Sequence, residues 1–110
     1  MVEEMEKATD VFHALAHGAR RNMLERLSTG DLTVGELAAP LDMSLAAASK
    51  HILVLERAGL VSRRVVGTRH FCRLSPAPMA FAAAWLNHYE RFWNVRLDAL
   101  ADLFTETSPS

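Results

Sequence analysis

Ser49 and Lys50 are the hydrogen-bonding side chains of this 110-residue chain whose sequence surroundings are most informative about function. Both lie in residues 44–60, SLAAASKHILVLERAGL, where three apolar residues recur at helical spacing and can be buried together: Ala48, Ile52 and Leu55. The opposite face of such a helix carries small residues beside one lysine. A face of this kind can lie flush in the major groove of DNA, where lysine donates to guanine acceptors.

Other residues could bind a metal or catalyse a reaction. His13 and His17 are four residues apart, a spacing that can bind a metal ion from one helix. His70 and Cys72 alternate on one face of an expected strand, as a base and its nucleophile could, but no third residue orients them. The sequence contains no glycine-rich phosphate loop or metal triad. It therefore predicts neither an enzyme nor a cofactor.

Charge is distributed unevenly along a chain whose net charge is only −1. Residues 44–74 carry six Lys and Arg against a single Glu, whereas the segments on both sides are acidic. This distribution predicts one surface that faces phosphates. No apolar run reaches the roughly 18 residues of a membrane span, and the acidic N-terminus is unlike a signal peptide. Together with the lone Cys72, these features predict a cytoplasmic protein without membrane contact.

Hydrophobic periodicity and capping residues predict a single domain, residues 1–110, that begins with helices. Apolar spacing indicates four of them, at about residues 5–16, 19–28, 33–41 and 44–58. Phe12, Leu15 and Ala16 are expected on the core face of the first helix, and Gly18 is expected to end it. Thr33 and Glu36 form a capping box at the start of the third.

The pattern then changes from helical to alternating. Val61–Val66 and Arg69–Leu74 predict two strands of a hairpin, and Gly67 first in the two-residue loop favours a type II′ turn. A last helix is expected at about 79–104. The predicted fold class is therefore α+β and mostly helical.

Helix, helix, helix, turn, helix, hairpin and helix is the order of a winged helix-turn-helix. Over residues 11–76 the chain resembles the ArsR/SmtB family of bacterial transcriptional regulators, through the motifs ALAHGARRNMLERL, LTVGELAAPLDMSLAAASKHILVLERAGLV and GTRHFCRLSP. The resemblance implies a winged-helix homodimer with N- and C-terminal dimerisation helices. It also implies that the dimer binds an operator near its own promoter and represses it.

The resemblance makes residues 44–58 the recognition helix and residues 61–74 the wing. Ser49 and Lys50 would reach base edges, while Leu45 and Ala46 would contact thymine methyl groups. Three other positions are expected at the DNA backbone or the minor groove: Arg63, Arg64 and Arg69. Ser44 caps the helix and could touch a phosphate, and His51 is expected to pack within the protein or lie beside a phosphate. Arg20 and Arg21 are expected on a solvated helix face rather than at the DNA backbone.

The last helix carries an apolar stripe too wide for one small domain to bury. Some of these residues belong to the intrachain core, and the others are expected to form a two-fold interface with the first helix. The residues expected there are Phe12, Phe81, Trp85, Tyr89, Phe92, Trp93 and Leu97. A two-fold dimer predicts an operator that is an imperfect inverted repeat.

The metal ligands by which many ArsR/SmtB members sense their signal are missing. The third helix, TVGELAAPLD, has no cysteine, and on the last helix His88 is followed three residues later by Arg91 rather than an acid. We therefore expect no metal sensing of the usual kind, and either a small-molecule effector at the dimer interface or none. Two alternatives stay open: a metal-responsive repressor using His13 and His17, and a winged-helix module that binds proteins.

Overall fold

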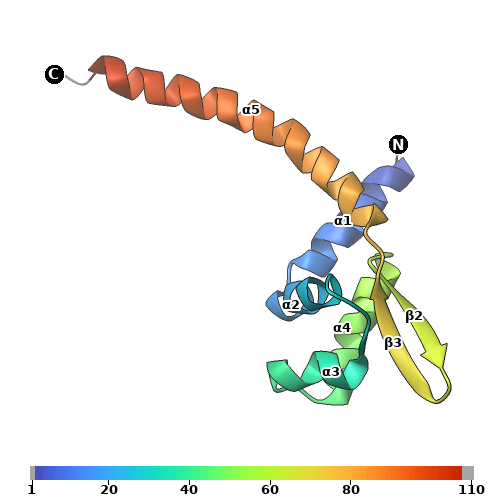
Figure 1. Cartoon of the computed structure of the whole chain (residues 1–110). Coiled ribbons are helices and arrows are strands. Elements are labelled where there is room, and N and C mark those ends of the chain that lie inside the picture. The colour runs from blue at the N-terminus through green and yellow to red at the C-terminus, as the bar shows by residue number, and fades with distance from the viewer. Residues whose placement is uncertain (1, 108–110) are drawn as a thin grey trace.

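A compact head and a long helical arm make up the molecule (Figure 1). The structure is a computed structural model that describes residues 2–107, with side chains described for residues 6–92 and 94–103. The head contains α1 (Val2–Leu15), α2 (Gly18–Leu27), β1 (Leu32–Thr33), α3 (Val34–Ala38), the 3₁₀ helix η1 (Ala39–Leu41), α4 (Leu45–Arg57), β2 (Val61–Val66) and β3 (Arg69–Leu74). The arm is α5 (Ala77–Thr107). The mostly helical α+β class is thus confirmed.

Side chains from α1 to α4 and from the sheet form one core. Ala48, Ile52 and Leu55 are fully buried, as their spacing predicts. The predicted core face of α1 is right only in part. Its buried residues are Ala8, Val11 and Ala14, Phe12 and Leu15 are half-buried against the core, and Ala16 is exposed. Helix α1 packs against α2, α4 and α5 together. Its smallest side chains therefore lie where the neighbouring helices approach most closely.

Capping side chains set the helix boundaries, and most agree with the sequence. Thr33 and Glu36 form the expected reciprocal capping box, and Ser44 Oγ accepts from the N–H of Ala47 at 3.1 Å. The expected end of α1 at Gly18 is wrong. The helix ends at Leu15, and His17 caps α2 by accepting from the N–H of Ala19. His13 and His17 therefore do not share one helix.

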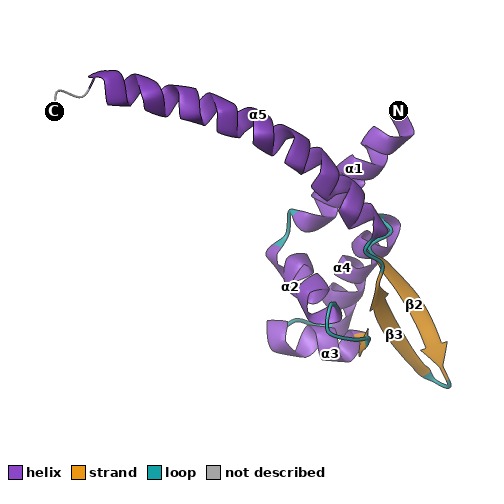
Figure 2. Cartoon of the chain, turned by 45° about the horizontal axis from the view of Figure 1, so that its top comes forward, coloured by secondary structure: helices purple, strands orange, loops and turns teal. Residues whose placement is uncertain are grey.

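The wing has its two expected strands and a third that the sequence did not predict. β2 and β3 pair with Val61 opposite Leu74, and they project from the helices as a hairpin (Figure 2). Gly67 has φ 62° and Thr68 has a negative φ, as a type II′ turn requires. β1 pairs with the other edge of β3, which ties the wing to α3. α3, α4 and the hairpin form a winged helix-turn-helix.

Helix α5 is longer at both ends than the 79–104 expected, at 31 residues. Its contact with the head is made near its start, where Ala82 is 2% exposed and packs into the core. It crosses α1 there, and the rest of the helix extends away from both α1 and the head (Figures 1 and 2). Among the described residues, no helix has the length and apolar content needed to span a membrane.

Candidate nucleic-acid interface

The outward face of α4 is flat and carries few hydrogen-bonding groups. Ala46 and Lys50 are exposed, Ser49 is half-buried, and Leu45 at the first turn is 61% exposed. Ser44 stands at the N-cap, so its hydroxyl already accepts one hydrogen bond from the helix. Lys50 is thus the strongest donor on this face.

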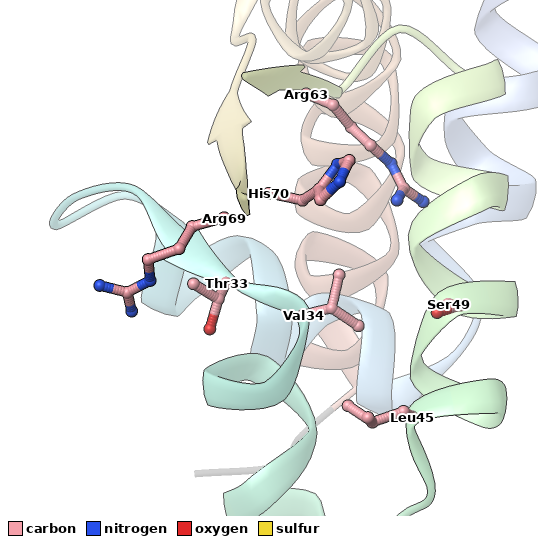
Figure 3. Close-up of a pocket in the computed structure, with 7 residues that line it drawn as sticks. All are labelled: Thr33, Val34, Leu45, Ser49, Arg63, Arg69 and His70. Carbon is pink, nitrogen blue, oxygen red and sulfur yellow. The ribbon is translucent and has the colours of Figure 1, made fainter. Parts of the chain in front are cut away.

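A groove of about 540 Å³ separates α4 from the wing (Figure 3). Ser49 and Leu45 line it from α4, Arg63 and Arg69 from the wing, and Thr33, Val34 and His70 complete it. In Figure 3, Arg63 and His70 extend from the strands toward α4, whereas Arg69 turns toward the side of Thr33. The fold therefore brings four of the predicted DNA-contacting residues to one groove. It also adds His70, which the sequence suggested only as a partner for Cys72.

Carboxylates hold three arginines of the wing. Nε of Arg63 donates to Oε1 of Glu56 on α4 at 2.7 Å. Two longer ion pairs follow the same pattern: Arg73 with Asp31 at 3.2 Å, and Arg69 with Glu36 at 4.0 Å. These acidic partners were not predicted, because Asp31 and Glu36 are distant from the wing in sequence. The pairs of Glu56 and Glu36 fasten the wing to α4 and α3, and that of Asp31 fastens it to the loop before β1.

Of the four cations predicted to contact DNA, the pairing leaves two for an external partner. Among the side chains that the structure describes, Lys50 and Arg64 form no ion pair with a carboxylate. The charge of Glu36 beside the wing is permanent near neutral pH, because hydrogen bonds from Thr33 and the nearby Arg69 hold the pKa of its carboxyl below its usual value. Both the basic side chains and nearby carboxylates that stay ionised near neutral pH therefore contribute to the surface potential around the groove.

Arg20 is buried, so its predicted place on a solvated helix face is wrong. The residue is 8% exposed, and Nε donates to the carbonyl oxygen of Ala14 at 2.7 Å. Nη2 donates to the carbonyl oxygen of His13, and Nη1 lies 3.2 Å from Nδ1 of His51 on α4. The next residue, Arg21, is exposed and donates to the carbonyl oxygen of Leu15.

His51 packs inside the protein, one of the two positions expected for it. Its ring lies 4.4 Å from the ring of His17, centroid to centroid, and is half-buried. Burial lowers the pKa of His51, and the neighbouring His17 and Arg20 lower it further. It is therefore a neutral supporting residue of α4 at pH 7.

Arg26 is a further structural cation that the sequence did not reveal. Its guanidinium donates to the carbonyl oxygens of Glu36 and Leu37, in the last turn of α3. A cation there satisfies terminal carbonyls and interacts favourably with the helix dipole. Because α3 is only five residues long, this contact fixes the helix that packs across α4.

Neither the catalytic nor the metal-binding pair is assembled as the spacing suggested. Cys72 is fully buried, and burial raises the pKa of its thiol, whereas His70 is exposed. His17 lies outside α1, and its Nδ1 accepts from Ala19. Within the part of the chain that the structure describes, no three His, Cys, Asp or Glu residues gather in a metal-binding arrangement.

The apolar face of α5 is uncovered along most of its length. Trp85 contacts Phe12 of α1 edge to face at 5.5 Å between ring centroids, and Tyr89 lies 4.4 Å from Trp85. The predicted interface residues on α5 with described side chains are 41% to 57% exposed: Phe81, Trp85, Tyr89, Phe92 and Leu97. The side chain of Trp93 lies outside the described residues.

Comparison with known proteins decides the family. Residues 15–64 match a helix-turn-helix domain model. A helix-turn-helix-type transcriptional regulator of Mycobacterium tuberculosis is 44% identical over 92 residues, which cover 84% of this chain and 83% of the relative. The crystal structure of an ArsR family transcriptional regulator, 38% identical, superposes with a TM-score of 0.74 over 81% of this chain and 92% of the other. The chain belongs to the ArsR family.

The ArsR family assignment makes this chain a winged helix-turn-helix transcriptional regulator. A solution structure from Mycobacterium bovis, described as a homodimeric winged helix-turn-helix DNA-binding domain, is 30% identical. It has a TM-score of 0.65 and covers 80% of this chain and 83% of its own. The likeness extends beyond the matched helix-turn-helix domain to the wing and part of α5.

Proposed function

We propose that this ArsR-family regulator is a sequence-specific, double-stranded DNA-binding repressor that acts as a homodimer. The observation that carries the proposal is the groove between α4 and the wing, with Ser49 and Arg63 on its walls. A helix whose exposed side chains are mostly small can enter the major groove without steric conflict. The wing would then lie against the adjacent backbone.

The proposed contacts follow from exposure and pairing. Lys50 would donate to guanine, with Ser49 beside it and Leu45 and Ala46 against thymine methyl groups. Arg64 would bind a phosphate directly, because it forms no ion pair with the described carboxylates. The same role for Arg63 and Arg69 requires each to leave its carboxylate. Ser44 has its helix-capping role and could approach a phosphate as well.

The homodimer is proposed from the uncovered face of α5. Its aromatic and aliphatic side chains, with Phe12 of α1, continue along the arm far beyond the head. A second copy related by a two-fold axis would cover them and set the distance between two α4 helices. An inverted-repeat operator follows from that symmetry.

Repression is proposed over activation because related proteins of Bacillus subtilis and Agrobacterium fabrum are named repressors, although one of Vibrio cholerae is named an activator. A dimer bound at its own promoter would exclude RNA polymerase by occupancy and act in the cytoplasm, where the bacterial chromosome lies. The fully buried Cys72 supports a binding function rather than catalysis. The structure offers no support for the alternative site at His13 and His17, since the two residues do not share a helix.

A gel-shift titration with the promoter region upstream of the chain's own gene tests the proposal. We expect Lys50→Ala to weaken specific binding about tenfold, the typical loss of one good base contact. Arg57→Ala removes the same charge from the other end of α4 and should change the affinity about twofold or less. No shift by the unmodified protein at low salt, or equal losses in both variants, would contradict the proposal. Parallel lanes with Zn²⁺ or a chelator test metal independence.

A further inference from the structure

Arg20 joins three helices through one buried guanidinium. Two of its nitrogens donate to carbonyl oxygens at the end of α1, those of His13 and Ala14, and the third is 3.2 Å from Nδ1 of His51. The residue itself belongs to α2 and His51 to α4. Besides the core packing between α1 and α4, one side chain therefore links the end of α1, the helix expected at the dimer interface, to the DNA-reading helix by hydrogen bonds.

The contact between Arg20 and His51 exists in only one protonation state. A guanidinium has donors and no acceptor, so Nδ1 of His51 must accept and the ring proton must be on Nε2. A protonated imidazole has two donors and no acceptor, so it cannot receive this hydrogen bond. Protonation would also place a second positive charge beside the buried guanidinium.

Among the described side chains, Arg20 and His17 are the titratable groups that act on His51, and no carboxylate acts on it to balance a new charge. Arg20 faces it from α2, and the ring of His17 faces it from the turn between α1 and α2. From the described part of α1 come the carbonyl oxygens of His13 and Ala14, which hold Arg20 in place. The neighbours of His51 therefore favour its neutral form, which agrees with the lowered pKa of its ring.

We propose that Arg20 and His51 form a proton-sensitive joint between α1 and α4, through which acidification releases the repressor from DNA. With His51 neutral, the hydrogen bond holds α4 in its position for reading the operator. When His51 gains a proton, the bond breaks and the two cations repel each other. Arg20 is a positioning residue in this inference, which rests on the proposed DNA-binding function.

The direction of the pH effect separates this joint from general electrostatics. Because DNA is an anion, added protons on a protein ordinarily strengthen binding. The joint predicts the opposite, a loss of affinity as the pH falls. A histidine whose pKa is lowered in the folded state stabilises that state above the ordinary value of 6.5. This contribution is lost as the pH falls through the lowered pKa.

The test is the operator affinity of the 110-residue chain from about pH 7.5 to about pH 5.5, at constant salt. We expect a loss of about tenfold for the unmodified protein. His51→Asn keeps an acceptor for Arg20 and cannot titrate, so its affinity should stay level or rise. His88→Asn, on α5, is the matched control and should behave like the unmodified protein. Equal pH profiles for the unmodified protein and His51→Asn would overturn the joint. It would also be overturned if His51→Asn lost binding at neutral pH while its melting temperature stayed unchanged.

His17→Asn gives a graded second test. Asparagine is a good N-cap, so α2 keeps its start while the imidazole beside His51 is removed. The pKa of His51 should rise, and the loss of binding should begin at a higher pH. An unchanged midpoint would contradict the role given to this cluster.

Nuclear magnetic resonance of the unmodified protein tests the joint without any variant. The ring signals of His51 and the Nε–H signal of Arg20 should titrate with one common midpoint below 6.5. Independent midpoints would overturn the joint whatever the DNA experiments show. If instead the titrations coincide but no operator DNA binds at any pH, the proposed function is the part that fails.

Discussion

The head and the arm differ in where their side chains find partners. In the head, apolar residues of α2, α3 and α4 are buried together, and the wing arginines Arg63, Arg69 and Arg73 meet carboxylates of the same chain. In the arm, large apolar residues from Phe81 to Leu103 are 41% to 69% exposed. Local and tertiary interactions within one chain are sufficient for the head. The arm has a surface whose burial requires another molecule.

This difference means that the two parts respond to mutation in different ways. A change in the head core should reduce the free energy of unfolding of each chain. A change on the apolar face of the arm should instead affect association, which depends on protein concentration. Exposed apolar surface of this extent marks an interaction site in soluble proteins.

The largest effect is expected from Leu55→Ala in α4. Leu55 is fully buried, so its truncation loses transfer free energy and leaves a cavity, which costs about 2–5 kcal/mol of unfolding free energy. Leu53→Ala, two residues earlier on the exposed side of the same helix, should cost less than about 1 kcal/mol. Urea denaturation followed by circular dichroism measures both. Similar losses would contradict the assignment of the two faces of α4.

Leu100→Glu in the arm should act on association and leave the head folded. Leu100 is exposed in the single chain but belongs to the apolar stripe, so a carboxylate there would be buried unpaired in a dimer. We expect the dimer Kd to rise about 100-fold, equivalent to about 2.7 kcal/mol. Sedimentation equilibrium measures this change.

Asn94→Glu is the control for the arm, since it adds the same charge on the polar side of α5. Its dimer Kd should remain close to that of the unmodified protein. If Leu100→Glu and Asn94→Glu associate equally well, the exposed stripe is not the dimer interface. A partner other than a second copy of the chain would then have to cover the apolar face of the arm.

Features determined by a few neighbouring residues could be predicted from the sequence. The capping box of Thr33 and Glu36, the cap at Ser44 and the hairpin with its turn at Gly67 all depend on residues within a few positions. The buried face of α4 was predictable for the same reason, because helical periodicity places Ala48, Ile52 and Leu55 together.

Features determined by contacts between distant segments could not be predicted. From the sequence alone Arg20 is expected to be a surface cation, because its burial depends on the packing of α2 against α1 and α4. Its partner His51, on α4, is 31 residues away along the chain. β1 has only two residues, and it forms because its backbone pairs with the edge of β3. The core face of α1 was predicted only in part, because that helix packs against α2, α4 and α5, and periodicity alone does not show which of its residues each of them buries.

The smallest effect is expected where the wing must exchange an internal partner for an external one. Glu56→Gln keeps an acceptor for Nε of Arg63 but removes the charge that holds it. Both side chains are about one-third exposed or less, so the loss of unfolding free energy should stay below about 1 kcal/mol. Operator affinity should rise about threefold, because Arg63 then binds a phosphate without leaving a carboxylate and one negative charge is gone from the interface.

Glu25→Gln, on the exposed side of α2, is the matched control for the loss of charge, and its affinity should change less than that of Glu56→Gln. Fluorescence anisotropy with labelled operator resolves a threefold difference. A fall in affinity on Glu56→Gln would mean that the ion pair positions the wing for DNA instead of competing with it. In that case Arg63 would keep its carboxylate partner when the protein binds DNA, and the wing would resemble the rest of the head in keeping its internal contacts.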